Sequence, residues 1–526
     1  MSKKIATVRL INEVQAAING VSPRECKELS DEFSFFANNY FFNPEFQLER
    51  WDGKTKFFTP GGVTYIEMLP DVLFELKDMG YSIKLKDERK PFDLVVEKIG
   101  KDYFSEYGWT IADHQLKAIN AVTENNHKGI IKVGTGGGKT LITAVLADLY
   151  RNKGKRIIII VPNKDLIEQT KEEIEQFGIE VGAYYQKEKN LGPAIVVSTW
   201  QSLGRNPRIL HDFDGFMVDE AHGTKANVLQ NLLCGDTGKN MPIRIGLTGT
   251  LPDHDTDKLT VFCALGQVVS EVRSEQLISE GWLAKLNLTM LGFKEDFKEE
   301  YEQFKNQFKD DPKLKDVAYA EFKRKYLFPE YQNEKSYLIH NSDRMETLAL
   351  MIQKTTEKYG NSFVLVNSVD FGKKLSKLIG DNAIFISSSI KDRKPIYKSF
   401  DESNGIVGIA TFNLASTGLN IPRLFNVFVV DGGKSSVRVV QTIGRGLRKA
   451  VDKDQVNVID VYSSVVFSTK HAAKRKKIYK EEKYAFTELK SLKYEEKTDR
   501  EKTVQNLLKT IKSLRYDSKL ENEVFD

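Results

Sequence analysis

The chain has 526 residues, of which 40% are hydrophobic and 29% charged, with a formal net charge of +5; this composition is typical of a globular protein with several domains. No apolar run reaches the length of a membrane span and the first residues contain no apolar signal core, so neither a membrane protein nor a secreted one is expected. The three cysteines, Cys26, Cys234 and Cys263, are far apart, which excludes a CxxC zinc site and favours a reducing, cytoplasmic compartment.

Residues 1–100 have a pattern of their own. Aromatic residues cluster at positions 33–36 and 40–42, and the stretch at 69–79 predicts a helix. We expect a small α+β module here, separate from the remainder of the chain, in which most of the aromatic rings form a core.

A hairpin turn is predicted inside this module. Asp52-Gly53 lies between apolar stretches, and an Asp-Gly pair favours the left-handed conformations of a tight turn. Trp51, Lys54 and Lys56 would then be exposed at the hairpin tip.

Short apolar strands alternate with amphipathic helices from about residue 109 to 269, and a second series of the same kind runs from 362 to 462. Strands separated by helix-length segments indicate a parallel sheet built from right-handed crossovers. We therefore predict an α/β fold with two parallel-sheet lobes in tandem. The predicted strands are 130–133, 156–161, 194–198, 216–218 and 243–247 in the first lobe and 363–366, 383–386, 407–410, 427–430 and 456–461 in the second.

The region between the lobes, residues 293–336, is rich in charged and aromatic residues and is predicted to be helical with a break at Asp311-Pro312. We expect a solvated helical insertion. A nucleic-acid contact or a helix that links the two lobes is the alternative.

The tail from Thr469 onward is predicted to be mostly helical, with a basic run at its start. A solvated helix face is the ordinary interpretation of such a run, and phosphate contact is the alternative on a protein that grips DNA. The basic residues are Lys474, Arg475, Lys476 and Lys477.

The predicted domains are 1–100, 101–285, 286–340, 341–465 and 466–526.

A glycine-rich loop follows the first predicted strand and opens a helix-like segment. Its residues are Gly134, Thr135, Gly136, Gly137, Gly138, Lys139 and Thr140. Glycines let successive N–H groups point at phosphate oxygens, and the start of the next helix favours negative charge. Lys139 would reach the β- and γ-phosphates and the Thr140 hydroxyl would bind Mg²⁺. Val133 stands where the strict pattern has glycine, so the loop departs from that pattern by one bulky residue.

Two adjacent carboxylates end another apolar strand, in Asp219-Glu220-Ala221-His222. The carboxyl end of a strand is the usual ligand position in an open parallel sheet. Asp219 would hold Mg²⁺, and Glu220 would orient and deprotonate the attacking water. The loop and the carboxylates together predict hydrolysis of a nucleoside triphosphate.

The ordered set of motifs from residue 109 to about 462 resembles a superfamily 2 helicase of the DEAH-box type. The resemblance implies two RecA-like lobes that use ATP and Mg²⁺. It makes Gln115 the residue that reads adenine, since an amide can pair in both directions with an adenine edge. It also makes His222, with Thr248 and Thr250 of a segment similar to motif III, the coupling between nucleotide state and grip on nucleic acid.

Segments that resemble motifs Ia and Ib lie at 161–169 and 198–203, although Asn163 stands where threonine is usual. Both should lie at strand ends on the face that touches the nucleic-acid backbone. The predicted nucleic-acid contacts are Thr199 and Gln201 in the first lobe, Thr411 and Asn413 in the second, and Trp51, Lys54, Lys474 and Arg475 outside the motifs.

The second lobe contains segments similar to motifs V and VI. The first makes Gly418 a nucleotide contact, and the second makes Gln441 a coupling residue. Arg445 and Arg448 are three apart, so both can lie on one helix face. An arginine presented from the opposite lobe stabilises γ-phosphate charge and is typically worth about 10³ to 10⁵ in rate. Arg448 is the predicted finger and Arg445 a γ-phosphate or coupling contact, and the reverse assignment stays open.

The amino-terminal module narrows the expected activity. Residues 43–46 and 51–54 are similar to the corresponding part of phage recombination helicases of the UvsW type, in which this module binds double-stranded nucleic acid. The likeness implies an ATP-dependent DNA helicase that remodels branched DNA in recombination, repair and replication. Fork regression, Holliday-junction branch migration and R-loop or D-loop unwinding are the expected reactions.

The implied partners are branched or duplex DNA, held mainly through phosphates, and RNA in hybrids. No membrane partner is expected, a monomer is favoured, and the phage resemblance implies the host cytoplasm. The alternatives are an RNA helicase, the translocating motor of a restriction system, and a non-enzymatic duplex-binding protein.

Overall fold

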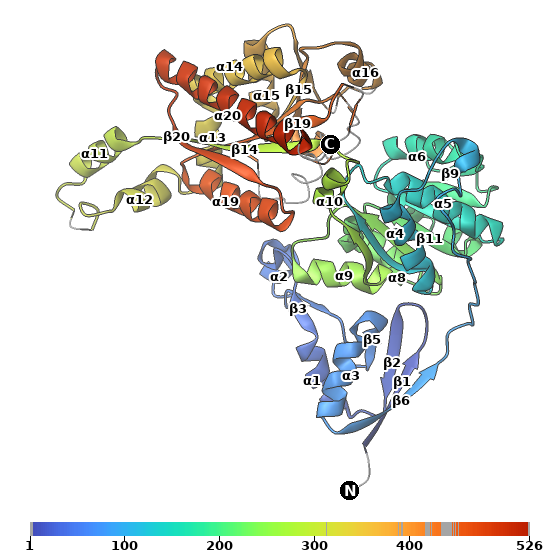
Figure 1. Cartoon of the computed structure of the whole chain (residues 1–526). Coiled ribbons are helices and arrows are strands. Elements are labelled where there is room, and N and C mark those ends of the chain that lie inside the picture. The colour runs from blue at the N-terminus through green and yellow to red at the C-terminus, as the bar shows by residue number, and fades with distance from the viewer. Residues whose placement is uncertain are drawn as a thin grey trace. The chain divides into compact units, whose positions relative to one another are not determined.

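The computed structural model divides the chain into two compact units, Met1–Arg273 and Ser274–Asp526, whose elements are labelled in Figure 1. The residues that it describes are 4–311, 313–387, 389–390, 393–415, 421, 423–432, 444, 447, 449–450 and 452–523.

A four-stranded sheet forms the centre of the amino-terminal module. Its strands are β1 (Lys4–Leu10), β2 (Gln15–Asn19), β5 (Val63–Tyr65) and β6 (Tyr81–Asp87), with helices α1 (Pro23–Glu32) and α3 (Leu69–Asp78). The order is β5-β2-β1-β6, with β1 antiparallel to β2 and parallel to β6. Alternate residues face the core, where Ala6, Val8 and Ala16 are fully buried. Helix α1 begins after Ser22, which forms a capping box with Glu25.

The tight hairpin predicted at Asp52-Gly53 is wrong. Strands β3 (Ser34–Phe36) and β4 (Lys54–Lys56) are antiparallel, but residues 37–53 separate them, with a 3-10 turn at Tyr40–Phe42 and helix α2 (Pro44–Gln47). Gly53 has a φ of 77°, and a Cβ there would stand 2.7 Å from the Tyr40 ring. The glycine is therefore required by aromatic packing rather than by a two-residue turn.

The module packs firmly on the first lobe instead of standing apart from it. Its apolar core includes Cys263 and Leu259 of helix α9 (Asp255–Leu265). The Thr256 hydroxyl of the same helix donates to the carbonyl of Phe36 at 2.8 Å. The Lys128 ammonium donates to the carbonyl of Glu13 at 3.0 Å.

A parallel seven-stranded sheet forms the first lobe. Its strands are β7 (Lys128–Val133), β8 (Ile157–Val161), β9 (Val181–Tyr184), β10 (Ile195–Thr199), β11 (Gly215–Asp219), β12 (Ile243–Thr248) and β13 (Val268–Val272), and its helices include α4 (Asp113–Glu124), α5 (Lys139–Asn152), α6 (Asp165–Glu175), α7 (Trp200–Arg205), α8 (Asn227–Cys234) and α9. The order is β13-β7-β12-β11-β8-β10-β9. The five predicted strands are confirmed within two residues at each end, and the two strands that were missed, β9 and β13, lie at the edges.

The second unit is built on another parallel seven-stranded sheet, in the order β16-β17-β15-β18-β19-β14-β20. Its strands are β14 (Lys285–Phe293), β15 (Ser362–Val366), β16 (Ala383–Ile386), β17 (Val407–Thr411), β18 (Asn426–Val430), β19 (Gln455–Ser463) and β20 (Phe486–Leu492), and its helices include α10 (Ser274–Ser279), α14 (Ser342–Tyr359), α15 (Val369–Ile379), α16 (Lys394–Glu402), α17 (Phe412–Ala415), α19 (Val466–Glu481) and α20 (Lys497–Glu523). The two sheets confirm the prediction of two RecA-like lobes.

The tail is part of the second lobe and is not only helical. Strand β20 pairs with β14 at the edge of the sheet. Helix α20 contributes Val504, Leu507 and Ile511 to the lobe's core. The strand was missed because its partner lies almost 200 residues earlier in the chain.

The insertion has an apolar core of its own, so it is more than a solvated helix. Its helices are α11 (Lys298–Gln307), α12 (Tyr319–Phe322), a π-helical turn (Lys323–Leu327) and α13 (Tyr331–His340). Phe297, Phe304, Phe322 and Phe328 pack together with Val465 of the lobe. Over the described part of the chain, no helix has both the length and the apolar character needed to cross a membrane.

Candidate nucleotide and nucleic-acid sites

The glycine-rich loop connects β7 to α5 in the first lobe. Gly136 and Gly138 have φ values of 87° and 80°, a left-handed conformation that glycine adopts without a steric penalty. Gly138 is the N-cap of α5, so the loop delivers the chain to a helix start with its N–H groups available for an anion. Val133 is fully buried as the last residue of β7, so its bulk fills the core.

The start of α4 rests on this loop. The Gln115 amide nitrogen donates to the carbonyl of Gly137 at 3.3 Å, and its oxygen accepts from the Ala112 N–H at 2.9 Å. His114 Nε2 lies 3.1 Å from the same Gly137 carbonyl. A Cβ on Gly138 would collide with the Gln115 amide. Because both ends of the amide are engaged, pairing with adenine requires Gln115 to exchange these contacts.

The loop also meets the segment predicted as motif III. A Cβ placed on Gly249 would lie 3.6 Å from Lys139 Nζ and 3.5 Å from the Thr135 hydroxyl. Position 249 is therefore within van der Waals distance of the lysine that is predicted to reach the phosphates. The sheet order explains the proximity, because β12 ends beside β7 with Thr248 opposite Lys132.

Asp219 ends β11, and Glu220 follows it in a left-handed conformation with φ 53°. Such a conformation is uncommon for a residue other than glycine and is often found at functional sites. His222 Nδ1 lies 3.4 Å from Glu220 Oε2 and 3.2 Å from the Thr248 hydroxyl. The Thr248 hydroxyl donates to the carbonyl of Thr250 at 2.6 Å. A continuous line of polar contacts thus runs from the carboxylate of Glu220 to Thr250.

These residues fit a nucleoside triphosphate with Mg²⁺. The glycine-rich loop leads into the N-terminus of α5, with Gly136 and Gly138 in left-handed conformations, and Lys139 supplies a cation at its end. Asp219 and the Thr140 hydroxyl are oxygen donors of the kind that Mg²⁺ prefers. Lys139, Thr140, Asp219 and Glu220 are all partly accessible to solvent.

The predicted nucleic-acid contacts of the first lobe lie at strand ends on the carboxyl edge of the sheet. The Thr199 hydroxyl accepts from the Ser202 N–H at 3.2 Å and caps α7, and Thr199 itself is buried. Gln201 is exposed, and its amide donates to the carbonyl of Pro162 at 3.4 Å. Gln201 is therefore the more accessible of the two.

Most predicted residues of the second lobe lie outside the described residues. These are Gly418, Gln441, Arg445 and Arg448. Thr411 is half-buried at the end of β17, and Asn413 belongs to α17, although its side chain is not described.

The structure corrects the prediction for Arg475. Its side chain is 1% exposed, and Nε and Nη2 donate to the carboxylate of Asp460 at 2.8 and 2.7 Å. A guanidinium that is buried and paired in this way is not available to a DNA phosphate. The neighbouring Lys474 is exposed and remains a predicted contact.

The exposed rings of the amino-terminal module are also not those expected. Trp51 is half-buried, and its indole N–H donates to the carbonyl of Lys54 at 2.9 Å. Phe41 and Phe42 are instead 50% and 70% exposed. Lys54 is half-buried, with its ammonium 5.3 Å from the centre of the Phe36 ring.

Two family models match parts of the chain. One, described as "Type III restriction enzyme, res subunit", matches residues 109–253. The other, described as "DNA helicase UvsW, N-terminal", matches residues 21–86. The two models therefore cover the site of the first lobe and most of the amino-terminal module.

Relatives extend the likeness to most of the chain. The ATP-dependent DNA helicase uvsW of Enterobacteria phage T4 is 28% identical over 479 residues, which are 86% of this chain and 89% of the relative. The crystal structure of T4 UvsW aligns with 93% of this chain and 100% of its own, at 22% identity and a TM-score of 0.43. The S. cerevisiae Dbp5 structure with RNA and ADP BeF3 aligns with 78% of this chain and 96% of its own, at 14% identity and a TM-score of 0.51, which supports the fold alone.

Proposed function

We propose that this chain, a superfamily 2 helicase similar to UvsW over most of its length, is an ATP-dependent DNA helicase that remodels branched DNA. The reactions are fork regression, Holliday-junction branch migration and the unwinding of R-loops or D-loops, in the host cytoplasm and with the protein acting as a monomer. The observation that carries the proposal is the line of contacts from Glu220 through His222 and Thr248 to Thr250, directly beside the glycine-rich loop. Two matched regions of the chain, residues 109–253 of the motor and residues 21–86 of the UvsW-type module, support DNA as the substrate.

Each residue of the first lobe has a defined task in the proposed reaction. Lys139 neutralises charge on the β- and γ-phosphates, and Thr140 and Asp219 hold Mg²⁺, which supplies further charge neutralisation. Glu220 orients the attacking water and accepts its proton. Phosphoryl transfer depends mainly on positioning and charge stabilisation, so these few groups are sufficient.

The remaining tasks fall to the coupling residues and the second lobe. The contacts of His222 and Thr248 couple the nucleotide state of the phosphate site to the segment that leads into α9. Arg445 and Arg448 stabilise charge on the γ-phosphate in the transition state. Backbone contacts hold the DNA strand without reading its sequence.

The amino-terminal module provides the argument for branched DNA. Phe41 and Phe42 are neighbouring exposed rings, 4.4 Å apart, and aromatic faces stack on unpaired bases at about 1–3 kcal/mol per base. The segment that carries them is bonded to α9 through Phe36 and Thr256. Helix α9 begins five residues after Thr250, so the rings are joined to the motor through a short, direct connection.

ATP hydrolysis tests the proposal when it is measured with no polynucleotide and then with single-stranded DNA, duplex DNA, a four-way junction and RNA. Stronger stimulation by forked or four-way DNA than by RNA is the expected result. Equal or stronger stimulation by RNA would move the protein to the RNA helicases. DNA cleavage would favour a restriction motor, and a complete lack of hydrolysis would favour a non-enzymatic duplex-binding protein.

Salt provides a second measurement. DNA affinity should fall steeply with ionic strength, with a log–log slope of about −0.9 per duplex phosphate neutralised. A flat response would contradict binding through the backbone.

A further inference from the structure

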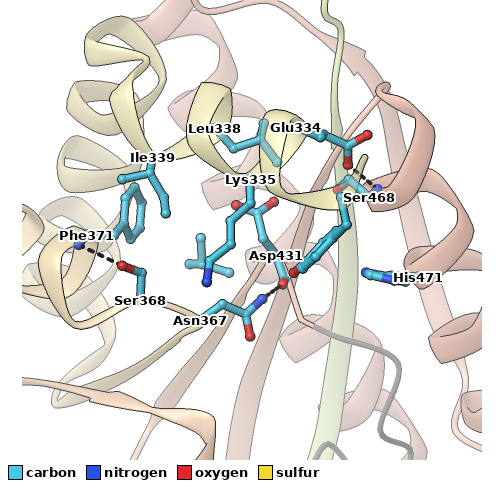
Figure 2. Close-up of a pocket in the computed structure, with 12 residues that line it drawn as sticks. Glu334, Lys335, Leu338, Ile339, Asn367, Ser368, Phe371, Asp431, Ser468 and His471 are labelled. Carbon is cyan, nitrogen blue, oxygen red and sulfur yellow. Dashed lines mark hydrogen bonds between the residues drawn. The ribbon is translucent and has the colours of Figure 1, made fainter. Parts of the chain in front are cut away.

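Two accessory parts of the chain are attached to a lobe, and the two attachments differ in kind. In the second unit, helix α13 of the insertion is held by Glu334, whose buried carboxylate accepts from the N–H groups of Phe467 and Ser468 at 2.6 Å each. Figure 2 shows Glu334 at a cavity of about 30 Å³, which Asp431 also lines. A cavity of this size accommodates one or two water molecules rather than a nucleotide. This attachment therefore serves to fix the insertion on its lobe.

In the first unit, the attachment of the amino-terminal module is helix α9, which has two apolar faces. Leu259 and Cys263 belong to the core of the module, whereas Val261, Ala264 and Leu265 belong to the core of the first lobe. A surface helix normally has a single apolar stripe, so α9 is enclosed between the module and the lobe. The module is thereby attached to a helix that is also part of the motor.

The lobe face of α9 packs against the turn that follows Glu220 and carries His222. The turn begins at Ala221, which shares the core of the lobe with α9. The two elements meet over Gly246 of β12, where a Cβ would stand 2.8 Å from Leu265 Cδ1 and 2.9 Å from Ala221 Cβ. Helix α9 therefore contacts the turn that joins the proposed catalytic base to the coupling histidine.

The first turn of α9 holds the aromatic segment of the module, residues 36–42, at two points. The hydroxyl of Thr256, a residue that is 5% exposed, donates to the carbonyl of Phe36 at 2.8 Å. The Asn38 amide donates to the carboxylate of Asp257 at 3.2 Å. Because Thr256 and Asp257 are adjacent, both contacts tie the aromatic segment to the same end of the helix.

Ring contacts extend this attachment from Phe36 to the exposed rings. Phe36 stacks on Tyr40 with the ring centres 4.5 Å apart, Tyr40 meets Phe41 edge to face at 5.6 Å, and Phe41 lies 4.4 Å from Phe42. Gly53 leaves room for the Tyr40 ring, since a Cβ there would stand 2.7 Å from it. Aromatic pairs have preferred geometries, so the place of Phe36 on α9 sets the place of the two exposed rings.

We propose that Thr256 is a positioning residue for the opening of branched DNA, because its hydroxyl fixes Phe41 and Phe42 on α9. The same helix packs against the turn that follows Glu220, so the rings and the catalytic turn keep a defined relation while the motor works. Without the attachment, the motor still hydrolyses ATP and moves along a strand, but the rings no longer meet the junction in a fixed place. This inference rests on the proposed function, in which the two rings stack on unpaired bases.

The substitution T256V tests the inference, with T256S and T260V as matched controls. Valine keeps the volume of threonine without the hydroxyl, and serine keeps the hydroxyl. Thr260, one turn later, is 6% exposed and donates only within α9, at 2.9 Å. We expect T256V to lower the number of junction base pairs opened per ATP hydrolysed by about two- to fivefold, the usual effect of one hydrogen bond. Both controls should keep the parent ratio. The KM for ATP and the kcat on single-stranded DNA should be unchanged in all three.

The second contact gives an independent variant, N38A, at an exposed position. N38A should change the ratio in the same direction, and T256V combined with N38A should lower it by about tenfold or more, because both attachments are then lost. A 2-aminopurine base at the junction measures the stacking directly, since its fluorescence falls when it stacks, and this quenching should weaken in the double variant.

A parent ratio in the folded double variant would overturn the inference, and so would a loss in T256S as large as that in T256V. A circular-dichroism melt identifies the folded variants. If T256V does not fold, N38A alone decides, because its side chain lies on the surface: a lowered ratio supports the inference, and a parent ratio contradicts it.

A combination with ring substitutions separates this inference from the proposed function. If Thr256 acts through the rings, T256V should cause no further loss of unwinding in a protein in which Phe41 and Phe42 are both replaced by serine. Independent, additive losses would contradict the inference. If the ring substitutions alone leave unwinding unchanged, the stacking role in the proposed function fails, and that failure is visible before T256V is considered.

Discussion

The His222 ring donates a hydrogen bond to the Thr248 hydroxyl. That hydroxyl already gives its own hydrogen to the carbonyl of Thr250 at 2.6 Å, so the Thr248 oxygen, 3.2 Å from His222 Nδ1, can only accept from the ring. Nδ1 therefore carries a proton, and Glu220 Oε2 lies 3.4 Å from the same nitrogen. The histidine thus holds one N–H between the carboxylate of Glu220, which is proposed to activate water, and Thr248 of the segment similar to motif III.

Thr248→Val should uncouple hydrolysis from nucleic acid. Valine keeps the volume of the buried threonine but removes the hydroxyl that connects His222 to Thr250. We expect the stimulation of ATP hydrolysis by DNA to fall about tenfold or more, while ATP affinity stays near that of the parent. Thr260→Val, a buried threonine of α9 that donates only within its own helix at 2.9 Å, is the control. Equal stimulation in both variants would show that the contact line is not used.

Lys139→Ala should abolish hydrolysis. The lysine is the cation at the end of the glycine-rich loop, and without it the charge of the transferred phosphoryl group is not neutralised. Lys153→Ala, just past the other end of α5, should hydrolyse ATP at the parent rate. Steady-state phosphate release measures both, and retained turnover in Lys139→Ala would contradict the site assignment.

Glu220→Gln should bind ATP and turn it over very slowly. The amide keeps the size of the side chain and the Asp219 ligand remains, but no base is left to accept the proton of the water. A loss of about 10² or more in kcat is expected, with a fluorescent ATP analogue bound as in the parent. An exposed glutamate of the same lobe, Glu172, gives the control variant Glu172→Gln.

Replacing Phe41 and Phe42 together by serine should weaken unwinding of branched DNA. Both rings are exposed, so the fold loses little apolar packing, whereas unpaired bases lose two stacking faces. Unwinding of a four-way junction should fall by several-fold, with ATP hydrolysis on single-stranded DNA unchanged. Phe74→Ser, at a ring that is also 70% exposed but lies on α3, is the control. A similar loss in the control variant would indicate a general effect of the module.

The stability of the first unit should fall as the pH drops below about 6.5. His127 is buried, with Nε2 2.8 Å from the carbonyl of Leu94 and Nδ1 3.2 Å from the Tyr150 hydroxyl, and this burial lowers the pKa of His127 below its usual 6.5. A base with a lowered pKa in the folded state binds fewer protons than in the unfolded state. Its contribution to stability is therefore full above the unfolded pKa and is lost as the pH falls.

The thermal midpoints at pH 7.5 and pH 5.5 measure this effect. His127→Gln retains a donor for Leu94 but cannot be protonated, so its midpoint should change less between the two pH values than that of the parent. His211→Gln, at an exposed histidine, should behave as the parent does. Identical pH dependence in all three would contradict the assignment.

The elements that the sequence predicts best are those with a local signal. Each of the ten predicted strands is a short apolar run, and the glycine-rich loop and Asp219-Glu220 follow such runs directly. Strand β14 was not predicted because its nine-residue pairing is with β19, about 170 residues later, and no local pattern specifies that partner. The supposed hairpin at Asp52-Gly53 failed for the same reason, since β4 pairs across residues 37–53 rather than across two residues.

The mistake at Arg475 had a signal that could have corrected it. A basic run suggested an exposed face, but the buried residues of α19 are spaced by three and four: Ser468, His471, Ala472, Arg475, Ile478 and Tyr479. Position 475 thus lies on the stripe that faces the core. Helical spacing, rather than charge alone, separates it from the exposed Lys474.

The core that the amino-terminal module shares with α9 has a practical consequence for work with fragments. A motor begun near residue 101 would present Leu259 and Cys263 to water, where Val8, Leu29 and Phe58 now belong to the same core. Such a fragment should be prone to self-association and to thiol oxidation. A loss of activity in it would result from the exposed face of α9 rather than from a missing DNA contact. The module is separable in the alignment of families but not in the folded polypeptide, so its role is better tested by surface substitutions than by deletion.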